Sequence, residues 1–301
     1  MLFPYRNKLT TSKQTIPNKM RYLILKVAFF ISCYSLSGQH FEFSAGLYRI
    51  GYENNVSLTV NSDVYTHDPL GKYDLVTGSN DPDIVAAAPG WIRWIEDEFT
   101  QSCYQEYGNG DVDCCWEMNN YVVIEHPNGE WSQYTHIQHN SADDLGLDVG
   151  DWVTAGRAIG IEGTVGCSTG DHLHFELSRP FDTAHPFDTI GGFLNGNGEM
   201  LIPVVSGAGN PWMSDGDTKV ANPCNDNCAS SVEVNTSVGN GGQYIARADN
   251  YILASTSSNV TFSNGSTTQF RAGGYITLEP GFHAQAGTKF AALIKACNQQ
   301  N

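Results

Sequence analysis

Short runs of β-branched and aromatic residues, each ended by turn-forming residues, dominate residues 45–180 of this chain. Examples are residues 56–60, 121–125, 131–135 and 172–177, which are bounded by Gly, Asn, Asp or Pro. In residues 126–130, His-Pro-Asn-Gly-Glu, the Asn-Gly pair favours a tight hairpin turn. Apart from an apolar run near the N-terminus, no segment has the period of a long helix, so the sequence predicts an all-β fold.

The length and composition limit the possible classes of protein. A chain of 301 residues suggests about two domains, at ~150 residues each. Hydrophobic residues make up 41%, enough for a core, while 16% charged residues and 31 glycines exclude a coiled coil, a collagen-like chain and a highly charged disordered chain. The 16 basic and 32 acidic residues give a net charge of −16, which argues against nucleic acid as a partner.

The charge is distributed unevenly. Residues 1–38 contain six basic residues and no acidic one, which leaves 10 basic and 32 acidic residues, or −22, in the remainder. Residues 22–36 form an apolar run followed by Ser37 and Gly38, as in a secretory signal peptide cleaved near residues 37–39. We therefore expect residues 1–38 to be a signal peptide. The protein is then expected to be secreted, periplasmic or on the cell surface, with no stable membrane insertion after the signal peptide is cleaved. Alternatives are an uncleaved anchor, a lipid anchor at Cys33, and a start at Met20.

The cysteines also indicate an oxidising compartment. Beyond Cys33 there are seven: Cys103, Cys114, Cys115, Cys167, Cys224, Cys228 and Cys297. The first three flank a Gly- and Asp-rich insertion, which predicts a loop held by disulfides. No Cys-x2-Cys pair is present, so a structural zinc bound by thiolates is not expected. The pairing stays open, and the odd number leaves one thiol free or bonded to another chain.

The C-terminal third differs in composition. Residues 191–235 are rich in Gly, Asn, Asp and Pro and are predicted to be a linker. Residues 236–301 are rich in Gly, Ser, Thr and Ala, and the Ala-Gly-containing segment 272–278 recurs 14 residues later as 286–292. A short repeat of a turn and an apolar strand predicts a module of stacked β-coils. The alternative is an ordinary small β-domain.

Histidines and one aspartate form the candidate site. His172 and His174 lie two residues apart in a predicted strand, so their rings project from one face while Phe175 points to the core. His67 and Asp74 form a second pair upstream. A catalytic zinc site needs three protein ligands and one open position. His67, Asp74 and one histidine of the 172/174 pair supply that number.

These motifs, taken in order, resemble the lysostaphin-type (LytM-like) zinc endopeptidases, metallopeptidase family 23, which cleave peptide bonds in peptidoglycan. The matching elements are His67…Asp74, Tyr134-Thr-His136 and Ser168-Thr-Gly-Asp-His-Leu-His-Phe-Glu176, with residues 150–160 and 85–90 matching two glycine-containing stretches of the family. The likeness covers residues 45–180 and implies an antiparallel β-sheet peptidase domain at 40–190, before the small solenoid-like β-repeat domain.

Carried over residue by residue, the resemblance implies one zinc ion per chain with the ligands His67, Asp74 and His174. It implies that His136 and His172 are catalytic, with His172 the favoured general base and His136 orienting or stabilising the developing oxyanion. Which of the two takes the proton stays open. The implied partners are peptidoglycan peptides, and the oligomeric state is not indicated.

Two departures from the family concern the substrate. Six residues separate His67 from Asp74, and residues 78–83 replace a stretch that is usual in the family. The cysteine-bearing insertion at 100–118 is additional. We therefore expect the substrate-binding groove to differ from that of the family.

The C-terminal segment 275–294 resembles the coathanger-stack β-repeat of secreted Bacteroidota proteins, which implies a non-catalytic module. Three functions are compatible with the sequence. They are a peptidoglycan peptidase, a non-catalytic LytM-like regulator of other wall hydrolases, and a surface- or glycan-binding protein that acts through its C-terminal repeats.

Overall fold

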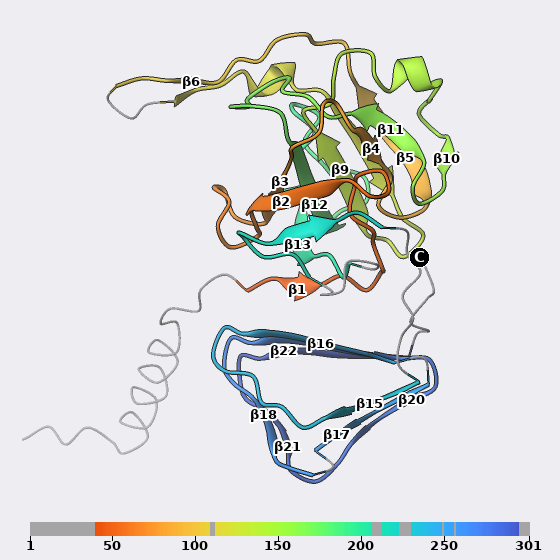
Figure 1. The fold of residues 1–301 in the computed structure, drawn as a ribbon, viewed down its shortest axis with the longest axis vertical. Helices are drawn as coiled ribbons and strands as arrows, with labels where there is room; N and C mark the ends of the chain where they lie inside the picture. The colour runs from red at the N-terminus through yellow and green to blue at the C-terminus, as the bar shows by residue number, and fades with distance from the viewer. Residues whose placement is uncertain are drawn as a thin grey trace, which may run out of the picture. The chain divides into compact units, whose positions relative to one another are not determined.

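A computed structural model describes residues 40–108, 112–205, 212–222, 230–248, 250–255 and 257–294 (Figure 1). The predicted signal peptide lies outside the described residues, as do Cys33, Cys224, Cys228 and Cys297. Within the described part of the chain, no helix is long and apolar enough to cross a membrane.

The central element is a sheet of ten strands. Eight of them form its main path in the order β10 (Trp152–Val153), β5 (Gly90–Glu96), β8 (Tyr121–Glu125), β9 (Trp131–Thr135), β12 (Leu173–Pro180), β3 (Lys72–Thr77), β2 (Ser57–Ser62) and β14 (Thr218–Val220). Along this path all neighbours are antiparallel. The prediction of an all-β fold built on an antiparallel sheet is confirmed.

Alternation of side chains gives the sheet one apolar face. Leu173, Phe175 and Leu177 of β12 are all buried, and Phe175 lies opposite Tyr73 of β3 and Tyr134 of β9. Each such side chain contributes about 1.5–3 kcal/mol when removed from water. The intervening residues of β12 therefore project from the opposite face of the sheet, where a polar site can be built.

Two stretches of the segment predicted as a linker, residues 191–235, lie in this sheet. β13 (Gly198–Ile202) pairs with β12, and β1 (Glu42–Phe43) pairs with β13 in parallel. β14 comes from the same segment and pairs with β2. The apolar residues Met200, Leu201 and Ile202 are buried and hold β13 in place. Its five residues are too few to stand out against the surrounding Gly and Asn.

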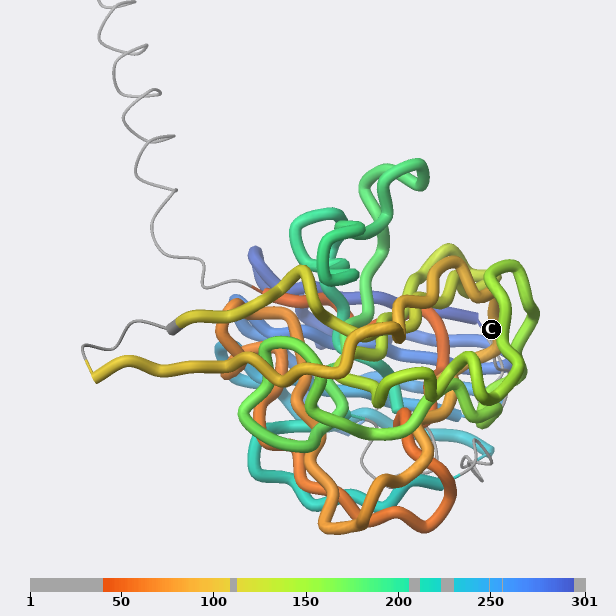
Figure 2. The backbone as a smooth tube through the Cα atoms, turned by 90° about the horizontal axis from the view of Figure 1, so that it is seen from above, coloured from red at the N-terminus to blue at the C-terminus, as the bar shows by residue number. Residues whose placement is uncertain are grey.

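The insertion is held by disulfides, as predicted. β6 (Gln105–Glu106) and β7 (Val112–Asp113) form an arm that extends from the rest of the domain (Figure 2). Cys103 bonds to Cys115 at the base of the arm, and Cys114 bonds to Cys167. The second bond ties the insertion to the Gly-rich loop before β12. A smaller sheet of β4 (Asp83–Val85) and β11 (Ala158–Ile161) and two short 3-10 helices, η1 (Trp116–Met118) and η2 (Asp143–Leu145), complete this part.

The C-terminal part consists of stacked coils, whose strands form three parallel sheets (Figure 1). The first contains β15 (Ser231–Val234), β17 (Tyr251–Ala254) and β20 (Tyr275–Leu278), the second β16 (Gln243–Ala248), β19 (Thr267–Ala272) and β22 (Lys289–Ile294), and the third β18 (Val260–Phe262) and β21 (Phe282–Ala284). Val234, Phe262 and Phe270 are buried in the centre of the coils.

The repeat length differs from the predicted one. Gln243 lies opposite Thr267, and Thr267 lies opposite Lys289, so successive coils are offset by 24 and 22 residues. The 14-residue recurrence compares a corner before β20 with a corner before β22, which are strands of different sheets. The 14-residue recurrence therefore reflects two corners of similar sequence and is not the length of one full coil.

Candidate metal centre

The register of three neighbouring strands brings Asp74 and His174 together. β12 lies between β3 and β9, and His174 is directly opposite Asp74 on one side and Thr135 on the other. Because paired residues of neighbouring strands project to the same face, the Asp74 carboxylate and the His174 ring meet on the polar face of the sheet. The close pairing of two residues 100 positions apart is thus fixed by backbone hydrogen bonding.

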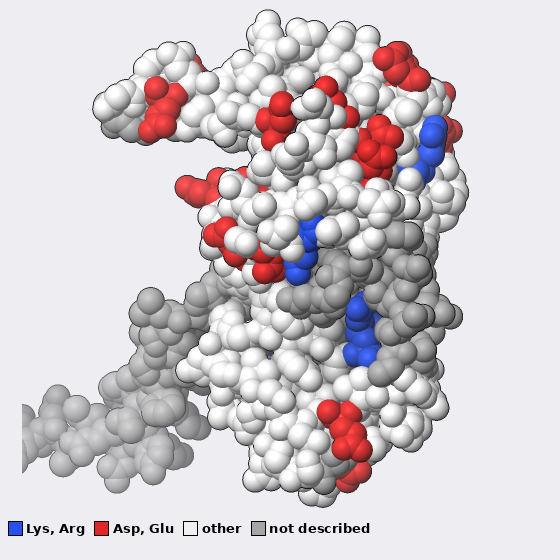
Figure 3. Space-filling view, in the orientation of Figure 1, with Lys and Arg blue, Asp and Glu red and all other residues white. Residues whose placement is uncertain are grey.

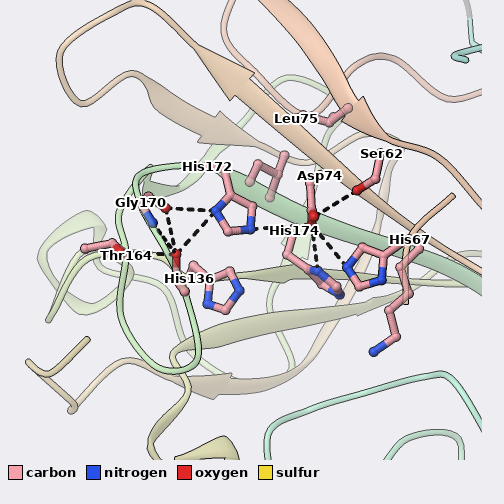
Figure 4. A network of polar contacts seen from close by, with 12 residues as sticks. Ser62, His67, Asp74, Leu75, His136, Thr164, Gly170, His172 and His174 are labelled. Atoms are coloured by element: carbon pink, nitrogen blue, oxygen red, sulfur yellow. Dashed lines mark hydrogen bonds and ion pairs between the residues drawn. The ribbon is translucent and has the colours of Figure 1, made fainter. Parts of the chain in front are cut away.

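Three loops supply the other histidines. His67 lies between β2 and β3, His172 precedes β12, and His136 follows β9. His136 has a φ of 67°, a left-handed conformation that is uncommon for a residue with a side chain and is concentrated at functional sites. Figure 4 shows His67, His172 and His174 against Asp74, and His136 lies next to His172, so all five predicted site residues form one cluster.

Asp74 is the centre of this cluster. Its Oδ1 lies 3.0 Å from His174 Nδ1 and 3.4 Å from both His67 Nε2 and His172 Nε2. Ser62 Oγ donates to Oδ2 at 2.9 Å. Burial opposes ionisation of Asp74, but the interactions with the side chains of His172, His174 and His67 outweigh it and hold the pKa of the carboxyl well below its ordinary value. Asp74 is therefore an anion at neutral pH.

The second nitrogen of each histidine ring is also engaged. Carbonyl and carboxylate oxygens only accept, so these nitrogens donate and the opposite nitrogens are left to face the cluster. The donor rings and their acceptors are His67 to Pro69 O (3.0 Å), His136 to Val165 O (2.7 Å), His172 to Gly170 O (2.9 Å) and His174 to Glu176 Oε1 (3.1 Å). Such outer hydrogen bonds are typical of histidines that bind metal.

Glu176 is a site residue that the sequence reasoning missed. Its Oε1 accepts from His174 and from Lys72 Nζ at 3.1 Å, while Oε2 accepts from the backbone N–H groups of Leu194 and Asn195. Burial opposes its ionisation, yet the bonds from His174 and Lys72 lower the pKa of Glu176 to about 2. A signal was present, because Glu176 is two residues from His174 and must share its face.

Among the described residues, two groups of three side chains could hold a metal ion, judged by the spacing of their ligand atoms. One is His67, Asp74 and His174, and the other is His136, His172 and His174. In each group the ligand atoms lie within 4.8 Å of one another. Imidazole nitrogens with one carboxylate suit zinc, and the fixed ring orientations fit that ion.

The two remaining histidines differ in their surroundings. His136 is buried, and burial together with the nearby rings of His172 and His174 holds its pKa well below the ordinary value. For His172, burial lowers the pKa, but the hydrogen bond to Asp74 outweighs this and raises it. Ser168 Oγ donates to Gly170 O, and this loop positions the His172 ring.

The cluster lies in a cleft of about 190 Å³, whose walls come partly from the insertion. Tyr104 and Trp116 of the insertion line it, together with Phe193 from the loop after β12. No sequence pattern indicates these three residues, because their proximity depends on the disulfides and on the path of a long loop.

His126 has a structural role outside the cluster. The ring is buried, with Nδ1 2.9 Å from Pro89 O and Nε2 2.8 Å from Ser132 Oγ. Burial lowers its pKa to about 4. His139 is exposed.

Residues 72–188 match the profile of peptidase family M23. This M23 segment contains Asp74, His136, His172 and His174, whereas His67 precedes it. The peptidoglycan DD-endopeptidase ShyA of Vibrio cholerae is 40% identical over 58 residues, which is 19% of this chain and 12% of that protein. The chain thus spans only a small part of this curated relative.

Solved structures of peptidases resemble a part of the chain. Lysostaphin of Staphylococcus simulans is 20% identical over 45% of this chain and 49% of its own, with a TM-score of 0.30. A zinc-containing peptidase from Vibrio cholerae is 19% identical over 46% of this chain and 36% of its own, with a TM-score of 0.26.

Proposed function

We propose that this protein is a secreted zinc metalloendopeptidase that hydrolyses peptide bonds in the stem or cross-bridge peptides of peptidoglycan. The observation that carries the proposal is the cluster of four histidines around Asp74, in which every ring has its second nitrogen held. The M23 match and the short similarity to a peptidoglycan endopeptidase support the substrate class.

We assign the zinc ligands to His67, Asp74 and His174, and one ion to each chain. This set includes the anionic carboxylate, which offsets part of the charge of a divalent cation, whereas the other set contains three imidazole rings and no carboxylate. It would also leave His136 and His172, which line the same cleft, available to act on a peptide and a water molecule.

The chemistry divides between the ion and the chain. Bound zinc lowers the pKa of a coordinated water toward ~7 and polarises a carbonyl. His136 and His172 each donate Nδ1–H to a backbone carbonyl and present Nε2. Either ring can therefore take a proton from the attacking water and return it to the leaving amine. Tyr104 and Trp116 would exclude water from one side of the cleft.

The test compares metal content and cleavage in single variants of the full chain. We expect His174→Ala and His67→Ala to lose zinc and to stop cleaving purified peptidoglycan. His136→Ala and His172→Ala should keep one zinc per chain and lose turnover by 10²–10⁴-fold, the usual range for general acid–base groups.

Three outcomes would contradict parts of this proposal. Full cleavage by zinc-free His174→Ala protein would refute the mechanism. Loss of zinc from His136→Ala but not from His67→Ala would favour the other ligand set. Wall binding without cleavage by wild-type, zinc-loaded protein would favour a regulator or a binding protein.

A further inference from the structure

A second pocket opens beside the metal cleft. It has a volume of about 450 Å³ and shares Pro69, Lys72, Trp116 and Phe193 with the cleft. Because four residues line both, the two pockets adjoin each other along this shared wall. A substrate held at the metal cleft would therefore have a neighbouring side chain at the mouth of this pocket.

The walls of the pocket are mostly apolar. Trp116 is 47% exposed and packs edge to face on Phe193, with their ring centroids 5.6 Å apart. Ile190 is 62% exposed and lines the same pocket. Large apolar side chains left this open beside a candidate catalytic cleft are typical of a binding site. They suit the aliphatic part of a substrate side chain.

The charges in the pocket are not balanced. The Lys72 ammonium lies 3.1 Å from Glu176, and both side chains are buried, so this cation is already neutralised. Asp188 is exposed, and its Oδ1 accepts from the backbone N–H of Ile190 at 2.9 Å. Among the described residues Asp188 has no ion pair with a basic side chain. The pocket therefore combines an apolar wall with one negative group.

We propose that this pocket binds a substrate side chain with an aliphatic stem and a terminal amine, the side chain of a diamino acid in the wall peptide. The stem would lie on Trp116, Ile190 and Phe193, and the amine would reach Asp188. This inference rests on the proposed peptidase function and narrows its substrate. Peptides with glycine on both sides of the cleaved bond leave the pocket empty and are poor substrates.

The experiment uses the zinc-loaded full chain and soluble peptides that differ at one position. Lysine, norleucine or glycine is placed in turn at each position flanking the cleaved bond, and binding and kcat/KM are both measured. At one of these positions we expect kcat/KM to be about tenfold higher for the lysine peptide than for the norleucine peptide, and about tenfold higher for norleucine than for glycine. Contacts of this size are worth 10–200-fold.

Two variants and two matched controls test the named residues. Asp188→Asn keeps the acceptor for the Ile190 N–H but removes the charge, so it should bring the lysine-to-norleucine ratio near one. Asp182→Asn is the matched control. It removes a charge from the same loop, and Asp182 does not line the pocket. Trp116→Ala should lower the norleucine-to-glycine ratio, whereas Tyr107→Ala, an exposed aromatic on the same insertion, should not.

The outcomes separate this inference from the proposed function. Cleavage with no preference among the three peptides, or an unchanged ratio in Asp188→Asn, overturns the pocket assignment while the peptidase stands. Lysine-selective binding without cleavage supports the pocket and refutes the peptidase. If the protein neither binds nor cleaves any of the peptides, both the pocket assignment and the proposed peptidase function are refuted.

Discussion

The hydrogen bond between His174 and Glu176 gives a test of the metal site that does not depend on activity. In Glu176→Gln the amide oxygen can still accept from the backbone N–H groups of Leu194 and Asn195, but the amide nitrogen then faces His174 Nε2. An amide nitrogen cannot accept, so Nε2 must give up its proton and the ring carries it on Nδ1. Nδ1 is the atom that faces Asp74 and, in our proposal, the metal.

The expected loss follows from the role of such outer bonds. Removing the partner of a metal-binding histidine usually weakens metal binding by 10–100-fold, or about 1.4–2.8 kcal/mol. The substitution also leaves Lys72 without its buried anion, which costs about 3–5 kcal/mol of folding stability. Zinc affinity must therefore be measured by chelator competition on protein shown to be folded by circular dichroism.

Lys72→Met is the matched control. It removes the other half of the buried ion pair but leaves Glu176 to accept from His174. We expect Lys72→Met to be destabilised and yet to bind zinc as tightly as wild type. Equal affinity in Glu176→Gln and wild type would refute the reasoning. Equal losses in both variants would show that general loosening, and not ring orientation, weakens the site.

Three further predictions concern stability. The pKa of His126 is lowered from 6.5 to about 4 in the folded state, so the unfolded chain binds the additional proton as the pH falls through this window. The free energy of unfolding should therefore drop by about 3 kcal/mol between pH 7 and pH 4. Denaturant titrations should show a weaker pH dependence in His126→Gln. Replacing Cys114 and Cys167 by Ser should lower the free energy of unfolding by about 2–4 kcal/mol, and zinc affinity should not change because no proposed ligand lies in the insertion. Chelation of zinc should leave the circular dichroism spectrum of the sheet unchanged, and adding zinc at 100 times Kd should stabilise the protein by about 2.7 kcal/mol, a shift that His174→Ala should abolish.

The sequence predicted that His172 and His174 lie together because strand alternation is a strong constraint. Once residues 172–177 are taken as a strand, His172 and His174 must share a face, and Phe175 must enter the core. The structure has both features, with Phe175 buried against Tyr134. The same rule applies to Glu176, whose role was overlooked because a glutamate in a strand is usually exposed to solvent.

Other features could not be predicted because they depend on contacts between distant segments. Nothing in the spacing indicates that Cys114 pairs with Cys167, 53 residues away. The path of residues 181–197, which brings Phe193 over Lys72, is equally hidden, since this loop has no periodic pattern. The coil length was misjudged because similar corners recur on different sides of the coils.

The parts that would hold a metal and the parts that would hold a substrate come from different kinds of structure. Asp74 and His174 stand on central strands whose other face is the core, so their geometry is fixed by the fold. Trp116, Asp188 and Ile190 stand on the insertion and on a loop, where changes are tolerated.

The overall charge fits this division. The net charge is −16, and acidic side chains outnumber basic ones on the face in Figure 3. Such a surface repels anionic wall polymers at long range, and screening limits this effect to about 10 Å at 0.1 M salt. Selection of a substrate must then depend on short-range contacts in the groove. Replacing Trp116 or Asp188 should accordingly change which peptide is cut without changing zinc affinity, because neither residue contacts the proposed ligands.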